Sequence, residues 1–190
     1  GYTEIRAKVA SSLKPSKFLH SQGVSDTAAM LAERFGLNVE EARICGIYHD
    51  AYRYDGTEDA LSYLESKGVP LFPEEVEEPM LLHGVLAAAH FEEDAEGIVP
   101  DYMKDAVRHH TLGSKAMGRL GAVIYISDYI EPGRKHLTEE NRREILSETS
   151  LEDMIVHIMD MQRPYLVREG INEAECSKEL YDFLKKGGKL

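Results

Sequence analysis

The chain has 190 residues, of which 43% are hydrophobic, and its formal net charge at pH 7 is −12. This size suffices for one sizeable core. The acidic balance disfavours a general nucleic-acid surface, because proteins that track phosphates gather lysine and arginine on one face. Cys45 and Cys176 form no Cys-x-x-Cys pair, so we expect reduced thiols and a cytoplasmic protein. The apolar runs are far shorter than the roughly 20 residues of a membrane span, and we expect no membrane partner.

Helical spacing of apolar residues dominates the chain, and no alternating β-branched run predicts a strand. The predicted helices are Thr3–Leu13, Pro15–Phe35, Val39–Tyr52, Thr57–Lys67, Pro79–Phe91, Asp101–His110, Arg119–Ile130, Glu139–Leu146, Leu151–Arg168 and Asn172–Lys186. Loops are expected where glycine and proline cluster, as at 68–73 and 97–100. We find no repeat or linker that divides the chain. The pattern therefore predicts an all-α fold with one domain over residues 1–190, a core at about 15–170 and a C-terminal helix packed on it.

Histidine and aspartate side chains interrupt the apolar faces of several of these helices. His20 continues the stripe of the helix at 15–35, and His49 continues that of the next helix at i, i+3, i+4, i+7 spacing. A single histidine on an apolar face is usually a hydrogen-bonded core residue, and this is the better interpretation of any one alone. Together, however, the residues could converge on metal. The candidate ligands are His20, His49, Asp50, His83, His110 and Asp128.

Burying these groups without a compensating cation would cost several kcal/mol for each stranded charge. Nitrogen and oxygen donors without thiolate suit iron, manganese, cobalt or zinc. The number of candidates allows two ions, with Asp50 as the natural bridge. Such a centre activates water and stabilises phosphoryl oxygens, which favours hydrolysis of a phosphoester or phosphoanhydride.

An anionic substrate also needs cations outside the metal shell. Basic residues close in sequence to the candidate ligands are Arg53, Lys115, Arg119 and Arg134. For each one alone, a solvent-exposed charge is the more common role. Histidines at 90, 136 and 157 lack such neighbours and are assigned to surface or core roles. His109 adjoins His110 but should face about 100° away from it on a helix, and its role stays open.

The ordered set of candidate ligands resembles the HD-domain superfamily of metal-dependent phosphohydrolases. Four strings narrow the resemblance to the YqeK-type branch, the bacterial symmetrical diadenosine tetraphosphate hydrolases. They are KFLHSQGV at 17–24, LLHG at 81–84, VRHHT at 107–111 and ISDYIEPGR at 126–134. The similarity spans roughly residues 15–170, which implies a single HD-domain helical bundle with the metal site between core helices.

The resemblance implies that one iron is held by His20, His49, Asp50 and Asp128, and the second by His83 and His110 with Asp50 shared. It also implies symmetrical cleavage of the tetraphosphate bridge into two ADP. The chain departs from the family pattern outside these ligands. Arg53 stands where lysine is usual, His109 where an aromatic residue is general, and Leu112 and Gly118 where small or hydroxyl residues are common. These departures concern the pocket rather than the ligands.

The leading hypothesis is therefore a hydrolase of diadenosine tetraphosphate that uses two divalent ions, most simply iron. Asp50 and Arg53 are the expected catalytic residues, and Arg53 with Lys115 or Arg134 would steady the phosphates. Alternatives are an HD-type hydrolase of mononucleotides or cyclic nucleotides, a non-hydrolytic nucleotide-sensing module and a di-iron oxygenase. The sequence leaves open the native metal, the number of bound ions, the nucleobase preference and whether the protein acts as a homodimer.

Overall fold

The computed structural model describes residues 1–53 and 57–190. Regular structure within these ranges is helical and contains no strand, so the predicted all-α class is confirmed. A short 3₁₀ turn, η1 (Pro79–Leu81), separates two of the helices. The α-helices are α1 (Tyr2–Ser12), α2 (Pro15–Phe35), α3 (Val39–Tyr48), α4 (Thr57–Ser66), α5 (Pro73–Glu77), α6 (Leu82–Ala95), α7 (Asp101–Arg108), α8 (Gly118–Ile130), α9 (Glu139–Leu146), α10 (Leu151–Arg168) and α11 (Glu175–Lys185).

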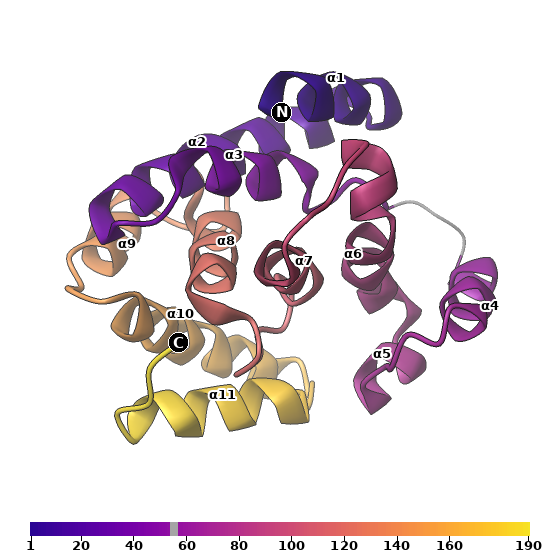
Figure 1. Cartoon of the computed structure of the whole chain (residues 1–190). Helices are drawn as coiled ribbons and strands as arrows, with labels where there is room; N and C mark the ends of the chain where they lie inside the picture. The colour runs from indigo at the N-terminus through magenta and orange to yellow at the C-terminus, as the bar shows by residue number, and fades with distance from the viewer. Residues whose placement is uncertain (54–56) are drawn as a thin grey trace.

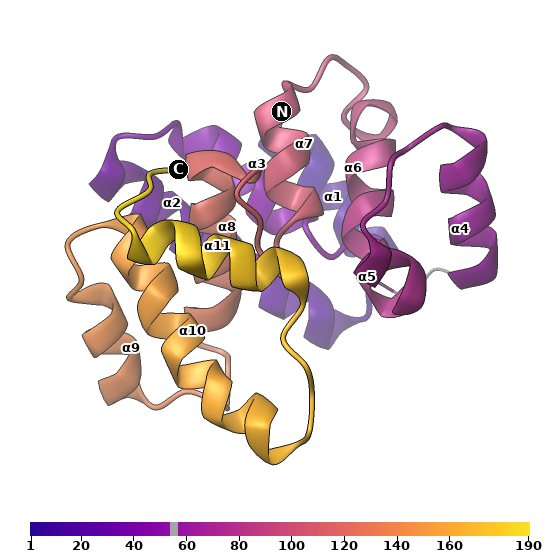
Figure 2. The same ribbon diagram turned by 90° about the horizontal axis from the view of Figure 1, so that it is seen from below.

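Helix α8 forms the centre of the fold. Every residue from Leu120 to Ser127 is buried. A helix that is apolar all round must be covered on all sides, and α8 packs against α2, α3, α7 and α10. Figure 1 shows α2 and α3 on one side of α8 and α10 on the other, while Figure 2 shows α11 lying beside α10. Side chains at the end of α8 therefore face neighbouring helices.

Local signals explain where several helices begin and end. Helix α2 has Pro15 at its first position, where the missing N–H costs nothing, and it ends at Gly36, whose φ of 75° suits a residue without Cβ. Asn38 is the predicted N-cap of α3, and its side chain accepts a hydrogen bond from the backbone N–H of Glu41 at 3.0 Å. The predicted bounds of α2, α9 and α10 are confirmed.

Helices α3, α4, α7 and α11 are shorter than predicted, α6 begins and ends later than predicted, and one helix was not predicted. Helix α3 ends at Tyr48 and α7 ends at Arg108. After α3 the backbone hydrogen bonds span three residues instead of four, as from Ala51 N–H to the carbonyl of Tyr48 at 3.0 Å, and the chain turns. The unpredicted helix is α5, where the Glu75 carboxylate accepts a hydrogen bond from the N–H of Phe72 at 2.7 Å. The early ends of α3 and α7 place His49 and His110 at the start of turns.

Buried apolar side chains form one continuous cluster that reaches from α1 to α11. Leu180 and Leu184 of α11 belong to it, and Ser177 donates a hydrogen bond to the carbonyl of Leu112 at 2.7 Å. A smaller cluster joins α4 to α6 through Leu64 and Leu82. A single domain with a packed C-terminal helix, as the sequence predicts, needs a core of this kind that the helices share. None of the helices in the described ranges combines the length and apolar character of a membrane span.

Candidate metal centre

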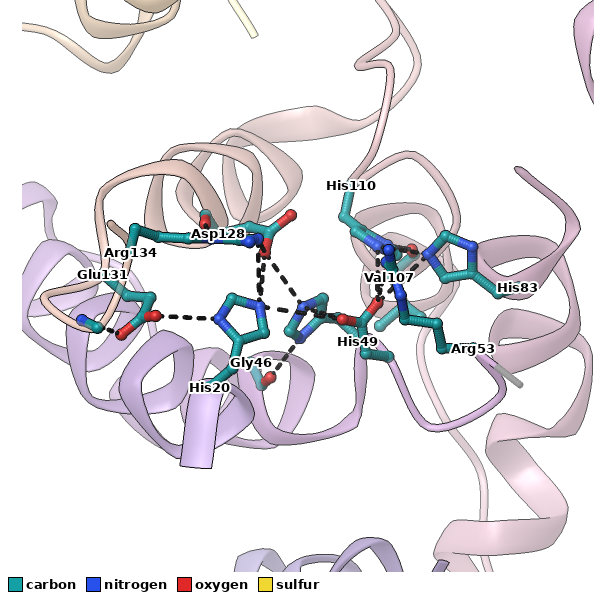
Figure 3. Close-up of polar contacts among 12 residues, drawn as sticks. His20, Gly46, His49, Arg53, His83, Val107, His110, Asp128, Glu131 and Arg134 are labelled. Atoms are coloured by element: carbon teal, nitrogen blue, oxygen red, sulfur yellow. Dashed lines mark hydrogen bonds and ion pairs between the residues drawn. The ribbon is translucent and has the colours of Figure 1, made fainter. Parts of the chain in front are cut away.

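Side chains from five separate segments meet beside the end of α8 (Figure 3). His20 comes from α2 and His83 from the start of α6, while the other three segments are the turns after α3 and α7 and the end of α8 itself. Possible ligand atoms within 4.8 Å of one another form three overlapping groups: His20, His49 and Asp50; His49, His110 and Asp128; and Asp50, His83 and His110. All six residues predicted as metal ligands are thus brought together.

Asp50 lies between two sets of histidines. Its Oδ2 is 3.4 Å from His49 Nε2 and 3.9 Å from His20 Nε2. Its Oδ1 is 3.3 Å from the Nε2 atoms of both His83 and His110. One carboxylate therefore turns one oxygen toward each set. A bridging ligand between two metal ions has this arrangement.

Three of the four histidines are oriented by their own helical turn. Each Nδ1 lies against the backbone carbonyl three residues earlier, at 2.7 Å for His49, 2.5 Å for His83 and 2.7 Å for His110. A carbonyl only accepts, so each Nδ1 carries a proton, and Nε2 is the nitrogen that offers a lone pair when the ring is neutral. The Nε2 atoms of His83 and His110 are 3.1 Å apart. Two facing lone pairs favour a cation between them.

Unpaired polar atoms mark the middle of the cluster. Within the described chain, His49 Nε2 and Asp50 Oδ1 lack a hydrogen-bond partner. Water cannot replace that partner easily, because the two residues are only 0% and 3% exposed. Leaving such groups without a partner is costly. The carboxyl ends of α3 and α7 add partial negative charge at the same place. The donors therefore fit divalent metal ions held by nitrogen and oxygen.

Mutual attraction shifts the pKa values of these groups. Burial disfavours a charged His49, but the carboxylates of Asp50 and Asp128 outweigh it and raise the pKa of His49 to about 10. Burial also opposes ionisation of both aspartates, yet the surrounding histidines hold the pKa of each carboxyl well below its usual range. Burial lowers the pKa of His110. Without metal, the cluster keeps its carboxylates ionised and holds a proton that a divalent cation would replace.

Two of the predicted substrate-binding residues flank the cluster from opposite sides (Figure 3). Arg134 donates from Nη2 to Asp128 Oδ1 at 2.7 Å and from Nε to the Asp128 carbonyl at 2.8 Å. Asp128 Oδ1 is in turn 2.9 Å from His20 Nε2. On the other side, Arg53 Nη1 is 3.8 Å from Asp50 Oδ1. Both arginines are thus close enough to reach an anion at the cluster.

The other two predicted substrate-binding residues lie elsewhere. Lys115 Nζ is 3.9 Å from a carboxylate oxygen of Glu179 on α11, and Arg119 Nη1 is 3.5 Å from one of Glu152 on α10. Arg119 is at the start of α8, whose far end carries Asp128, so the rise of the helix separates the two by roughly 13 Å. Closeness in sequence to a ligand was therefore a poor guide, and the structure does not support these two assignments.

A cavity of about 530 Å³ extends from the cluster between α8 and α10. His110 and Asp128 line it, and Arg134 and Arg168 give it positive charge. Tyr165 adds an aromatic ring, as do Tyr129 and His136, whose ring centroids are 4.8 Å apart. Guanidinium groups bind phosphate through paired hydrogen bonds, and aromatic rings stack on nucleobases. Sequence reasoning missed Arg168 and Tyr165, although their three-residue spacing places them on one face of α10.

The remaining four histidines lie outside the cluster. His90 stacks between two tyrosine rings with centroid distances of 4.7 and 4.8 Å, and His157 pairs with a glutamate at 3.0 Å. His136, for which a surface or core role was predicted, is exposed and also lines the cavity. His109 is buried against Phe72 with ring centroids 5.6 Å apart. The structure therefore gives His109 a packing contact rather than a place among the ligands.

Glu131 touches the cluster although no sequence argument singled it out. Its Oε1 is 3.1 Å from Nδ1 of His20, the ring nitrogen that faces away from the other ligands (Figure 3). The residue follows Asp128 by three positions at the end of α8. Residues at this spacing share one face of a helix, and this was the signal that could have identified it.

A family model described as HD domain matches residues 18–161. The chain belongs to the HD domain family. The matched range contains all six candidate ligands, so the resemblance inferred from the ordered histidines and aspartates is confirmed. The cluster at the end of α8 thus lies within the HD domain.

Relatives of this HD domain include three bacterial proteins named symmetrical bis(5'-nucleosyl)-tetraphosphatase. The Bacillus subtilis protein is 31% identical, with 87% of this chain and 88% of the relative covered. The Staphylococcus aureus protein is 28% identical, with 84% and 81% covered. A solved structure from Clostridium acetobutylicum, described as a predicted HD superfamily hydrolase involved in NAD metabolism, is 27% identical with a TM-score of 0.86 over 98% of both chains.

Proposed function

We propose that this HD domain hydrolyses dinucleoside tetraphosphates symmetrically, so that diadenosine tetraphosphate yields two ADP. The observation that carries the proposal is the placement of Asp50, whose two oxygens face separate sets of histidines. Relatives that cover most of the chain bear the name of this activity. The basic, aromatic cavity beside the cluster suits one nucleotide half of such a substrate.

The donor set would hold two divalent ions. His20, His49 and Asp128 with Asp50 Oδ2 form one set, and His83 and His110 with Asp50 Oδ1 form the other. Iron is our preferred metal, and manganese, cobalt or zinc suit the same donors. When bound, such ions supply Lewis acidity and lower the pKa of water toward about 7.

The arginines on the two sides of the cluster would position the phosphates. Arg134 faces the cavity between α8 and α10, so its guanidinium can hold the phosphates of the half bound there. Arg53 lies on the side of His83 and can hold the phosphate chain beyond the reacting phosphorus. Water adds to one of the two central phosphorus atoms, and the bond to the central bridging oxygen breaks. ADP leaves with that oxygen, and the second ADP carries the oxygen of water.

Product chromatography tests this proposal. Protein loaded with Fe²⁺ or Mn²⁺ is expected to convert diadenosine tetraphosphate to ADP alone. An Asp50→Asn variant loses the bridging charge, and its kcat is expected to fall at least about 100-fold. Substitution of residues that only support a metal ligand already lowers metal affinity or activity about 10- to 100-fold. Asp26→Asn is the matched control, because that carboxylate pairs with Arg43 at the surface.

Other outcomes would favour the other functions. Recovery of ATP and AMP would contradict symmetrical cleavage, and faster turnover of mononucleotides, cyclic nucleotides or NAD would assign the cluster to a different substrate. Nucleotide binding that persists in Asp50→Asn without any turnover by the wild type would favour a sensing module. An oxygenase would require O₂, so equal activity under anaerobic conditions excludes it.

A further inference from the structure

Glu131 is a buried carboxylate, 4% exposed, whose two oxygens have different tasks. Oε1 is 3.1 Å from His20 Nδ1. Oε2 accepts a hydrogen bond from the N–H of Gly133 at 2.8 Å. A carboxylate oxygen can only accept here, so Nδ1 of His20 donates to Oε1. Nε2, which is 2.9 Å from Asp128 Oδ1, is then the nitrogen that can give up its proton and bind a metal ion. The side chain thus sets which nitrogen of His20 can bind metal.

The surrounding chain leaves room for this carboxylate and holds its backbone. A Cβ added at Gly23 would lie 2.2 Å from Glu131 Oε2, and one added at Gly133 would lie 2.9 Å from Oε1. The buried Arg142 of α9 donates to the carbonyls of Ile130 and Glu131 at the end of α8. Two glycines and a buried arginine therefore fix the carboxylate in one position. A contact on the exposed surface would not hold a carboxylate in one position in this way.

His20 differs in this respect from the other three histidines of the cluster. His49, His83 and His110 are each oriented by a carbonyl of their own helical turn. His20 instead depends on a side chain 111 residues away in sequence. A carboxylate forms a stronger hydrogen bond with the ring N–H than a neutral carbonyl does. The two halves of the cluster are therefore supported differently.

We propose that Glu131 is a positioning residue that makes the two metal sites unequal. It orients His20 and strengthens the site built from His20, His49 and Asp128, and it leaves the site of His83 and His110 unaffected. The inference rests on the dinuclear centre of the proposed function. Loss of the carboxylate is expected to weaken metal binding at the first site about 10- to 100-fold, as is typical for carboxylates behind metal-ligating histidines.

Glutamine at position 131 cannot replace glutamate. Both contacts of the side chain need an acceptor, whereas an amide offers one acceptor and one donor. If the amide nitrogen faces His20, the ring must accept at Nδ1, and its proton moves to Nε2, which then cannot bind metal. If it faces Gly133, two N–H groups oppose each other and the turn shifts. Either arrangement disturbs the first site.

The matched control is a second carboxylate–histidine pair in the same chain. Glu148 Oε1 is 3.0 Å from Nδ1 of His157, and neither residue belongs to a group that could hold metal. Glu131→Gln and Glu148→Gln make the same chemical change in the same kind of contact. Only the first is expected to alter metal binding. Helical circular dichroism of the metal-free proteins checks that both variants fold.

Titration of the metal-free proteins with Co²⁺ measures the two sites separately, because its visible absorption reports on each coordination environment. Wild type and Glu148→Gln are expected to bind two Co²⁺ ions. Glu131→Gln is expected to bind one with unchanged affinity and the second about 10- to 100-fold more weakly. Binding of two ions with wild-type affinity by Glu131→Gln would overturn the inference. A wild-type protein that binds a single Co²⁺ would also overturn it.

A second variant covers the case in which Glu131→Gln does not fold. Gly23→Ala leaves the carboxylate intact but places a methyl group where Oε2 now lies, so it should weaken the same site, and unchanged binding would count against the inference. Failure of the proposed function can be distinguished from failure of this inference, because the two are judged by different measurements. If the wild type binds two ions and splits no tetraphosphate, the substrate is wrong, whereas the inequality of the sites is judged by Co²⁺ alone.

Discussion

Two cavities meet beside the metal cluster and share Thr111, Tyr125, Gln162 and Tyr165 in their walls, yet their charges are opposite. The cavity that contains Asp128 also contains Arg134 and Arg168 and measures about 530 Å³. The neighbouring cavity, between α5 and the last two helices, measures about 750 Å³. Its acidic lining residues are Glu74, Glu77, Glu78, Glu173 and Glu175. We call the first the basic cavity and the second the acidic cavity.

The comparison shows that size alone does not identify the substrate site. The acidic cavity is larger, but its carboxylates would repel a polyphosphate. The basic cavity is smaller and leads to the cluster, where Arg134 lies beside a candidate ligand. Phosphate groups should therefore enter the basic cavity and avoid the acidic one. Experiments that remove charge from each cavity test this difference directly.

Among the charged residues of the two cavities, the largest effect is expected at Arg134. Arg134→Gln removes the positive charge beside Asp128 and should lower kcat/KM for diadenosine tetraphosphate about 10- to 100-fold, because hydrogen bonds to charged groups contribute about 1.5–3 kcal/mol. Steady-state kinetics on protein of known metal content measures the change. Arg119→Gln is the matched control, since that arginine pairs with Glu152 away from the cluster. Equal losses in both variants would show that Arg134 does not contact phosphate.

Most of the helices and all six candidate ligands could be predicted from the sequence, for a physical reason. Candidate ligands such as His20 lie on apolar helical faces, and a buried polar residue in an apolar stripe is visible in the spacing. Arg168 and Glu131 were missed because their roles depend on which helices are neighbours in space. Lys115 was expected at the site and faces α11 instead. Local spacing thus predicts what points inward, whereas the partner of an exposed charge depends on tertiary packing.

Acid is expected to weaken a contact that holds the wall of the acidic cavity in place. Helix α5 is attached to the end of α7 by Phe72, which stacks on His109, and by Glu75, which pairs with Arg108 at 3.0 Å. Burial and the nearby Arg108 lower the pKa of His109 to about 4. Because its unfolded pKa is about 6.5, the unfolded chain binds more protons between pH 4 and 6.5, and stability falls as the pH drops through this range.

His109→Phe keeps an aromatic ring against Phe72 and removes the proton-binding group. On lowering the pH from 7.5 to 5, the free energy of unfolding of the wild type should fall by about 1–2 kcal/mol more than that of the variant. Urea unfolding of the metal-free proteins at both pH values measures this difference, and contributions from the candidate ligands, which both proteins share, cancel in it. Parallel pH profiles would mean that His109 has the same pKa in the folded and the unfolded chain.

The smallest and most discriminating effect is expected from exposed charges at the outer parts of the two cavities. Arg168→Gln removes a positive charge from the basic cavity, and Glu77→Gln removes a negative charge from the acidic one. Exposed charges contribute about 0.2–1 kcal/mol. The KM for the tetraphosphate should therefore rise about two- to fivefold in Arg168→Gln. In Glu77→Gln it should stay within about twofold of the wild type and change in the opposite direction.

Salt concentration separates an electrostatic effect from a change in packing. Because both residues are exposed, their influence on an anion should be screened when the ionic strength rises from about 0.05 to 0.5 M. The KM values of the two variants are then expected to converge on that of the wild type. If both substitutions raised KM equally at low salt, the two cavities would contribute alike to substrate binding. The charged residues of both cavities would then serve only to keep the protein surface hydrated. The phosphate chain would have to run along both cavities.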